Sequence, residues 1–416
     1  MIISAPLILP LRRNGESIRS GAVVVRGNAV VAVGPAGSLI RRFPSHKVIS
    51  FCDAVLMPGL VNVHTHLELP SLLDAVRAAS FTDWVLNLIA AKRKLTLRDY
   101  VRAASSNIRR LIETGTTTVG EICTHDVSPS LLNQSGLRAV IFREIISMEP
   151  GAEIRPLHKA DRNTARVQFG LSPHAPYTVS GSALRSLAAY ARRRNIRITM
   201  HVAESLDEVR LLHQKPSGLQ KLYQFAGWDV ACAPVAGSAI QYLWGQGILN
   251  SKLLAVHAVH VTEDDIRSIK TSRCSVAHCP RSNRELGVGR MPLSKLIDAG
   301  ITVGLGTDSL ASCRSLSMWD EMRSAYRMHV RNGITAEQII TLATKRGAQA
   351  LGLNSLGTLT PGSKADIIVI PLPKKDTGNI FADLLRESNT CTFSMVDGKI
   401  LRKMTDGTRL FSRSSS

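Results

Sequence analysis

The chain has 416 residues, of which 44% are hydrophobic, so it can bury a core larger than that of one average domain. No apolar run reaches the roughly 20 residues that a membrane-spanning helix needs, which argues against an integral membrane protein. The formal net charge is +20, but the basic residues are dispersed and accompany no nucleic-acid-binding motif. A basic outer face explains these residues as well as an anionic partner does. We therefore expect neither nucleic acid nor membrane as a partner.

The N-terminus and the cysteines indicate a cytoplasmic protein. The apolar stretch at the N-terminus contains Pro6 and Pro10 and lacks both a basic leading region and a cleavage site, so it does not resemble a signal peptide. The seven cysteines are scattered, odd in number and form no CxxC pair. This spacing favours neither a disulfide framework nor a cysteine zinc site.

Short β-strands are predicted at both ends of the chain. Ala22 to Val25 and Ala29 to Val33 are apolar runs joined by three residues that include a glycine, which suits a hairpin. Near the other end, β-like stretches run from Ala365 to Pro371 and from Ser394 to Leu401. We expect residues 1–57 and 355–416 to pair into one small β-sandwich domain.

The middle of the chain, residues 58–354, alternates apolar, β-branched runs with amphipathic helical patterns. Ser182 to Arg194 is a clear helical pattern, and Leu97 to Thr114 and Pro292 to Ala299 behave similarly. Eight strands that alternate with helices predict an α/β fold, a (β/α)8 barrel. The eight predicted strands are Leu60–Val63, Thr116–Ile122, Arg138–Ile145, Arg166–Leu171, Ile196–Val202, Leu253–His257, Cys274–His278 and Ile301–Gly306.

Two histidines mark the end of the first predicted barrel strand, in the sequence Pro58-Gly-Leu-Val-Asn-Val-His-Thr-His66. Residues i and i+2 of a strand point to the same face, so His64 and His66 can share one metal ion at the mouth of a barrel. An HxH pair alone is a weak signal, because structural histidines produce it as well. The preceding Pro-Gly-Leu-Val-Asn makes it more specific.

This stretch resembles the first barrel strand of the amidohydrolase superfamily, and later motifs follow in that family's order. They are Met200-His-Val-Ala-Glu204, Ala255-Val-His257-Ala-Val-His260, His278-Cys-Pro-Arg-Ser-Asn283 and Gly304-Leu-Gly-Thr-Asp308-Ser-Leu-Ala-Ser312. The similarity covers essentially the whole chain. It is closest to the chlorohydrolase and deaminase branch, and within it to deaminases of adenosine derivatives.

The resemblance implies a metal site and two catalytic side chains. The metal ligands would be His64, His66, His201 and Asp308, a nitrogen and oxygen set that suits Zn²⁺ or Fe²⁺. For Asp308 taken alone, a strand-end turn or cap is the simpler interpretation. Glu204 would shuttle a proton to the substrate ring, and His257 would act with Asp308 on the attacking water. His260 is expected to point away and to be structural.

Six further residues are expected to contact substrate. His174 resembles the residue that contacts the sugar of related substrates, but it also fits a buried turn between two prolines. Glu68 resembles a position that recognises ring or ribose groups. Trp84, with Phe81, could cover a ring or pack in the core, and Arg143 could bind a carboxylate or face outward. The motifs that carry the resemblance add Asn283 and Ser309.

The fourth predicted strand lacks a lysine. Binuclear members of the superfamily carry a bridging lysine at the end of this strand, whereas this chain has Ser172-Pro-His174 there. This departure favours one divalent metal ion. The resemblance therefore predicts an aminohydrolase with one divalent metal ion, Zn²⁺ in preference to Fe²⁺, that releases ammonia from a 6-aminopurine nucleoside derivative.

The substrates that the resemblance suggests are aminodeoxyfutalosine, which would imply a role in menaquinone biosynthesis, and S-adenosylhomocysteine or methylthioadenosine. The alternative is the deamination of guanine, cytosine or a triazine, or the hydrolysis of a ring amide or a carbon–halogen bond. A homo-oligomer is also expected from the resemblance.

Overall fold

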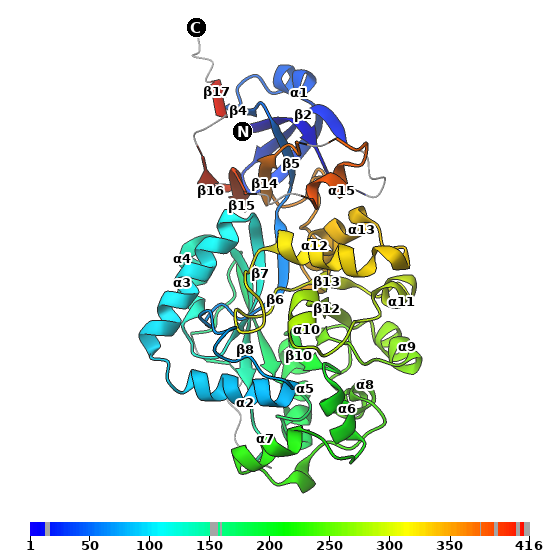
Figure 1. The fold of residues 1–416 in the computed structure, drawn as a ribbon. Helices are drawn as coiled ribbons and strands as arrows, with labels where there is room; N and C mark the ends of the chain where they lie inside the picture. Colours follow the sequence, from blue (N-terminus) through cyan, green and yellow to red (C-terminus); the bar gives the residue numbers. More distant parts are fainter. Residues whose placement is uncertain are drawn as a thin grey trace.

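A computed structural model describes residues 1–12, 17–149, 157–158, 160–374, 376–386 and 390–404, together with the backbone of 408–411. It has two parts (Figure 1): a sheet built from both chain ends, at the top, and a barrel of eight parallel strands below it. None of the described helices has the length and apolarity required to cross a bilayer.

The barrel strands follow one another in chain order, and each pairs in parallel with the next. The first and last strands meet where the amide of Asp308 donates to the carbonyl of His64 at 3.1 Å and the hydroxyl of Thr65 donates to the carbonyl of Asp308 at 3.0 Å. The barrel strands are β6 (Leu60–Thr65), β7 (Thr116–Cys123), β8 (Arg138–Ile145), β9 (Val167–Pro173), β10 (Ile198–Val202), β11 (Leu253–His257), β12 (Ser275–His278) and β13 (Val303–Leu305).

The second sheet combines strands from both ends of the chain, as predicted. The hairpin turns at Gly27, whose φ of +59° lies in the left-handed region that glycine adopts without strain. Ser394 to Leu401 forms two strands rather than one, because Asp397 and Gly398 also adopt positive φ and turn the chain back. The strands of this sheet are β1 (Ile2–Ile8), β2 (Ile18–Arg26), β3 (Ala29–Pro35), β4 (Val48–Phe51), β5 (Ala54–Pro58), β14 (Ile367–Pro371), β15 (Phe393–Val396), β16 (Lys399–Lys403) and β17 (Thr408–Phe411).

Most helices surround the barrel, whereas α1 packs on the terminal sheet, and several of them begin at polar capping residues. The hydroxyl of Ser80 accepts the amide hydrogen of Asp83 at the start of α2, and Thr96 and Asp99 form a reciprocal capping box at the start of α3. The helices are α1 (Ala36–Arg42), α2 (Phe81–Lys92), α3 (Leu97–Glu113), α4 (Ser128–Ser135), α5 (Gly181–Arg194), α6 (Leu206–Leu212), α7 (Leu219–Ala226), α8 (Ala239–Gly245), α9 (Glu263–Ser272), α10 (Pro280–Glu285), α11 (Leu293–Asp298), α12 (Met318–His329), α13 (Ala336–Leu342), α14 (Lys345–Ala350) and α15 (Ile380–Leu384).

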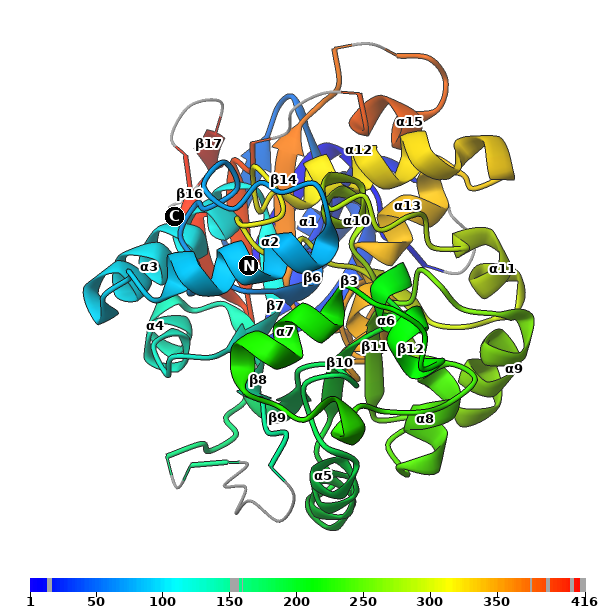
Figure 2. The same cartoon turned by 60° about the horizontal axis from the view of Figure 1, so that its bottom comes forward.

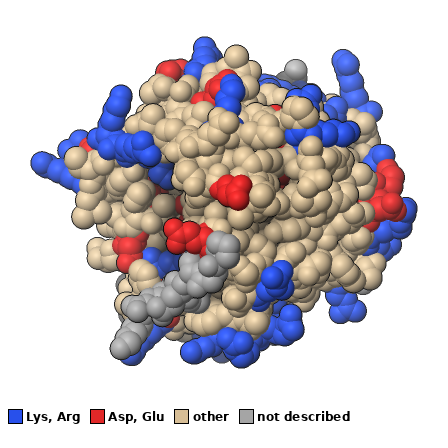
Figure 3. Space-filling view, turned by 90° about the horizontal axis from the view of Figure 1, so that it is seen from below, with Lys and Arg blue, Asp and Glu red and all other residues tan. Residues whose placement is uncertain are grey.

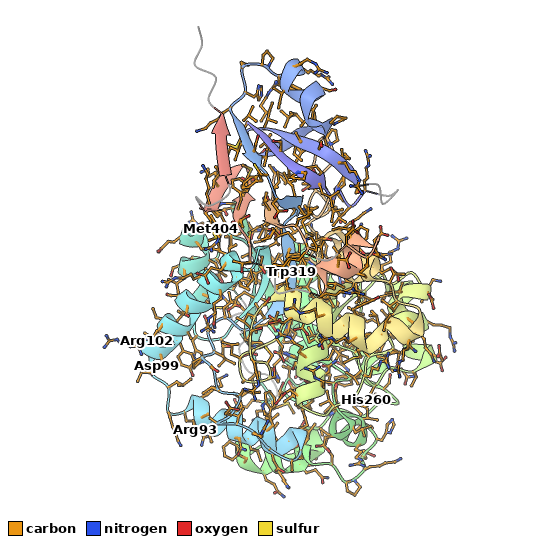
Figure 4. All side chains as sticks on the ribbon, turned by 45° about the horizontal axis from the view of Figure 1, so that its top comes forward. Arg93, Asp99, Arg102, His260, Trp319 and Met404 are labelled. Atoms are coloured by element: carbon orange, nitrogen blue, oxygen red, sulfur yellow. The ribbon has the colours of Figure 1, made fainter. Side chains whose placement is uncertain are left out.

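The terminal sheet is fixed to the N-terminal ends of the barrel strands. The guanidinium of Arg138, at the start of β8, is buried and donates to both carboxylate oxygens of Asp366 and to Asp397, at 3.0–3.2 Å. Within the barrel, the fully buried Trp319 on α12 (Figure 4) donates to the carbonyl of Thr114, just before β7, at 3.0 Å. These contacts leave the opposite end of the barrel, where the strands end, for a site. The division of the chain at residues 57 and 354 stays a prediction.

Candidate active site

Three histidines from the ends of two strands meet at the mouth of the barrel. His64 lies on β6, His66 directly follows this strand and His201 lies on β10. One ring nitrogen from each lies within 4.8 Å of the others. Asp308, which follows β13, places its Oδ1 at 3.7 Å from Nε2 of His64 and at 3.6 Å from Nε2 of His66. The four side chains that the resemblance names as ligands are therefore brought together.

The chemistry of these side chains fits a metal ion. His64 is fully buried, yet neither of its ring nitrogens has a hydrogen-bond partner among the described residues. Burial lowers the pKa of His64 to about 3 and that of His66 to about 4, so both rings are neutral at pH 7 and offer lone pairs. Buried polar atoms without partners are unfavourable. Neutral imidazoles with one carboxylate suit Zn²⁺ or Fe²⁺, which would satisfy them.

Neighbouring groups orient the candidate ligands. Nδ1 of His201 lies 2.9 Å from the carbonyl oxygen of His174, which leaves Nε2 for the metal. Oδ2 of Asp308 accepts hydrogen bonds from the hydroxyls of Ser282 at 2.5 Å and Ser312 at 2.8 Å. Oδ1 therefore remains available to a metal ion. Burial opposes the charge on Asp308, but the adjacent imidazoles of His64 and His66 hold its pKa well below the usual range.

Glu204 and His257 face each other beside the candidate ligands. Oε1 of Glu204 lies 3.3 Å from Nε2 of His257, and both side chains are buried. Burial raises the pKa of the Glu204 carboxyl to about 8, so this group can hold a proton near neutral pH. A carboxyl that titrates near the working pH is suited to general acid and base chemistry.

Backbone strain concentrates at the same strand ends. Ala203, His257, Ala258 and Asp308 have φ between +45° and +73°, a region that residues with a side chain rarely adopt. Such conformations cost free energy and persist where the surrounding structure imposes them. Here they set the directions of His257 and Asp308.

A cavity opens over these residues and is covered by an apolar roof. Helices α2 and α7 lie across the mouth (Figure 2), and the hydroxyl of Thr82 ties α2 to Asp207 at 2.7 Å. His174, Tyr177 and Glu204 line the walls together with three of the candidate ligands, His66, His201 and Asp308. The roof is formed mainly by Phe81, Trp84, Val85, Leu88, Ile89, Leu222 and Trp228. An apolar pocket with a few convergent polar groups is typical of a small-molecule site.

The surface around the mouth does not concentrate the excess positive charge. Figure 3 views this face and shows a mostly uncharged surface, with Lys and Arg mainly toward its edge and acidic groups near its middle.

The structure places three of the six expected substrate-binding residues in the cavity lining: Trp84, His174 and Ser309. Asn283 lies behind the lining, where its Oδ1 accepts a hydrogen bond from Nδ1 of His257 at 2.8 Å. His260, expected to be structural, faces away and contacts the carbonyl of Val288 at 2.7 Å.

Glu68 does not line the cavity, contrary to the expectation of a substrate contact. Its buried carboxylate accepts hydrogen bonds from the backbone amides of Thr124, His125, Val127 and Ser128, at 2.6–3.0 Å. All four donors belong to the loop after β7 and the start of α4. Glu68 thus holds this loop, and its oxygens are occupied by the backbone.

Arg143, which was expected to contact substrate, also lies outside the cavity lining. Its neighbour Glu144 lines the cavity instead. Successive side chains of a strand point to opposite faces, so only one of this pair can face the mouth. Arg143 pairs with Asp161 and Asp126 on the outer side. Glu144 lines the cavity with Lys92, and its Oε2 accepts from the hydroxyl of Thr124 at 2.7 Å. Sequence analysis missed Glu144 and Lys92.

The chain is similar in sequence to known deaminases. The chain is 31% identical over 386 residues to the 5-methylthioadenosine/S-adenosylhomocysteine deaminase of Pelotomaculum thermopropionicum. The aligned region covers 89% of this chain and 84% of the relative.

Two solved structures resemble the whole molecule. An adenosine deaminase from Xanthomonas campestris with bound zinc has a TM-score of 0.84 and 25% identity, and the match covers 97% of this chain and 94% of that one. The aminofutalosine deaminase of Helicobacter pylori, in complex with methylthio-coformycin, has a TM-score of 0.86 and 25% identity, with 96% and 99% covered.

The family model described as amidohydrolase family matches residues 55–410, which include the barrel and the candidate metal ligands but not β1–β4 of the terminal sheet. This match, the fold and the cluster at the barrel mouth agree with the resemblance noted in the sequence. The chain belongs to the amidohydrolase family.

Proposed function

We propose that the protein is a hydrolytic deaminase that releases ammonia from a 6-aminopurine nucleoside derivative. The observation that carries this proposal is the contact between Glu204 and His257, 3.3 Å apart, directly beside the candidate ligands in a covered cavity. Deamination of a ring needs one group that protonates a ring nitrogen and another that orients a water molecule. The names of the similar proteins support the same reaction.

His64, His66, His201 and Asp308 would hold one zinc ion, whose chemistry is to lower the pKa of a bound water and so provide a nucleophile near neutral pH. The missing lysine at the end of β9 supports one ion rather than two. A cytoplasmic location and a homo-oligomer stay predictions.

Other residues of this chain would transfer protons, position the ligands and exclude bulk water. Glu204 delivers a proton to the ring nitrogen next to the amino-bearing carbon. It then takes a proton from the hydroxyl group that has added to this carbon and passes it to the departing amine. His257, held by Asn283, keeps its Nε2 free to accept a proton from water. Ser282 and Ser312 fix the carboxylate of Asp308, and the apolar roof excludes bulk water.

The polar wall of the cavity fits a nucleoside. Glu144, Lys92 and His174 lie together on the lining, and a carboxylate can accept hydrogen bonds from both hydroxyls of a ribose. Apolar side chains of α2 cover the rest and would accept a 5′-thioether or another apolar substituent. Methylthioadenosine, S-adenosylhomocysteine and aminodeoxyfutalosine are the proposed substrates. A role in menaquinone biosynthesis would follow only from the last of these.

Ammonia release by the zinc-loaded protein tests the proposal. The panel consists of the three proposed nucleosides with adenosine, guanine and cytosine. We expect release from one or more of the 6-aminopurine nucleosides, and loss of release in Asp308→Asn and Glu204→Gln. Glu263→Gln, on the exposed face of α9, is the matched control and should retain activity.

Two results would contradict the proposal. Zinc-loaded protein that releases no ammonia from any nucleoside would move the assignment to ring-amide or carbon–halogen hydrolysis, the alternative reactions at such a site. Full activity in Glu204→Gln would remove the proposed proton carrier.

A further inference from the structure

A second polar cleft lies outside the substrate cavity, between α10, α12 and the segment that follows Asp308. Helices α10 and α12 pack side by side (Figures 1 and 2). The cleft has a volume of about 270 Å³ and is lined by five arginines, two carboxylates and three small residues. They are Arg281, Arg284, Arg314, Arg323 and Arg327, Asp320 and Glu285, and Ser312, Cys313 and Ser324.

The protein neutralises only part of this positive charge. Arg281 is buried and committed to Glu321 and to both oxygens of Ser315, and Arg323 pairs with Asp320. Arg314 is 69% exposed and approaches Asp74 only to 3.7 Å. Arg284 and Arg327 form no ion pair with the residues that the structure describes. At least two guanidinium groups therefore remain available to a ligand.

A buried hydroxyl in the cleft also lacks a partner. Ser324 is 6% exposed, and its Oγ makes no hydrogen bond within the described part of the chain. A buried donor without an acceptor is unfavourable, and an acceptor oxygen from a ligand would satisfy it. Guanidinium forks together with a hydroxyl match the oxygens of a tetrahedral oxyanion.

We propose that this cleft binds a phosphate group, either free phosphate or the phosphate of a nucleotide. The cleft is separate from the substrate cavity, which it approaches through Ser312: this residue lines the cleft and donates to Oδ2 of Asp308 at 2.8 Å. The proposal does not depend on the deaminase assignment.

Calorimetric titration of the zinc-loaded protein at constant ionic strength tests this site. Inorganic phosphate is one titrant, and uridine 5′-monophosphate, which has no 6-amino group to react, is the other. The cleft variant Arg284→Ala/Arg327→Ala changes two exposed side chains. The control variant Arg109→Ala/Arg110→Ala removes the same charge from exposed positions on α3.

We expect the cleft variant to bind phosphate at least about tenfold more weakly than the unaltered protein and the control variant to bind normally. Ser324→Ala, which leaves the charge unchanged, should weaken binding as well. Tighter binding of the nucleotide than of free phosphate would identify the nucleotide as the source of the group. Absence of binding, or equal loss in the cleft and control variants, would overturn the proposal.

Discussion

Asn283 accepts the Nδ1 hydrogen of His257 at 2.8 Å, and both side chains are at most 1% exposed. The contact fixes the ring so that Nε2, the nitrogen without a hydrogen, faces Glu204. Asn283→Ala removes the acceptor, so we expect kcat for deamination to fall by about 10–100-fold while the zinc content stays at its original value. Steady-state kinetics and metal analysis check this. An unchanged kcat would show that the ring needs no such support.

Glu68 is expected to support stability rather than substrate binding. Glu68→Ala leaves four backbone amides without their acceptor and should lower the free energy of unfolding by about 3 kcal/mol or more. Denaturation with urea measures this loss. Glu144→Gln, which removes only one charge from the cavity wall, should lose much less stability. A normal unfolding curve for Glu68→Ala, together with a raised KM, would contradict this prediction and support the substrate contact that the sequence suggested.

Substitutions at the adjacent residues Glu144 and Arg143 should differ in their effects on KM and on stability. Glu144→Ala removes a charged acceptor from the cavity, so KM for the nucleoside should rise by about 10–100-fold. Arg143→Met disrupts contacts with Asp126 and Asp161 on the outer side, so it should reduce stability and leave KM within about twofold. Kinetics and thermal unfolding of both variants separate the two roles. Equal effects on KM would contradict the placement.

A histidine pair predicts a loss of stability in acid. Nε2 of His278 lies 3.1 Å from Nε2 of His329, and both residues are buried. Burial, together with Arg290, lowers the pKa of His329 to about 4, and burial also lowers the pKa of His278 well below its usual value. In the unfolded chain both would titrate near pH 6.5.

The direction of the pH effect on stability follows from the number of protons that the folded and unfolded states bind. Between about pH 6.5 and 4 the unfolded chain binds more protons than the folded protein, so stability falls as the pH falls, by up to about 1.4 kcal/mol per pH unit for each histidine. His329→Gln should show a shallower decline, by about one proton, in urea denaturation between about pH 5 and 6.5. Parallel curves for the two proteins would show that His329 does not contribute.

The sequence predicted the strands of the barrel well, because apolar and β-branched runs of this length are characteristic of buried parallel strands. The observed β8 and β11 have the predicted bounds, Arg138–Ile145 and Leu253–His257. The predicted run Ser394 to Leu401 became two strands, since composition alone did not show that Asp397 and Gly398 adopt positive φ.

The site was predictable where a motif fixes both residue type and strand end, as for His64 and His66. It was not predictable where the direction of a side chain decides the role. Arg143 and Glu144 differ by one position, which is half the period of a strand, and only the pairing register shows which of them faces inward. For Glu68 no pattern indicated that four amides from a distant loop would surround it.

The barrel closes between its first and last strands, and three of the four candidate ligands lie at that junction. His64 and His66 precede Asp308 by more than half of the chain. A nascent chain therefore carries two histidines for most of its synthesis without the carboxylate that completes the set. Since a domain folds largely as a unit, secure retention of the ion would begin only after the eighth strand has emerged. Metal acquisition would thus report that the barrel is complete.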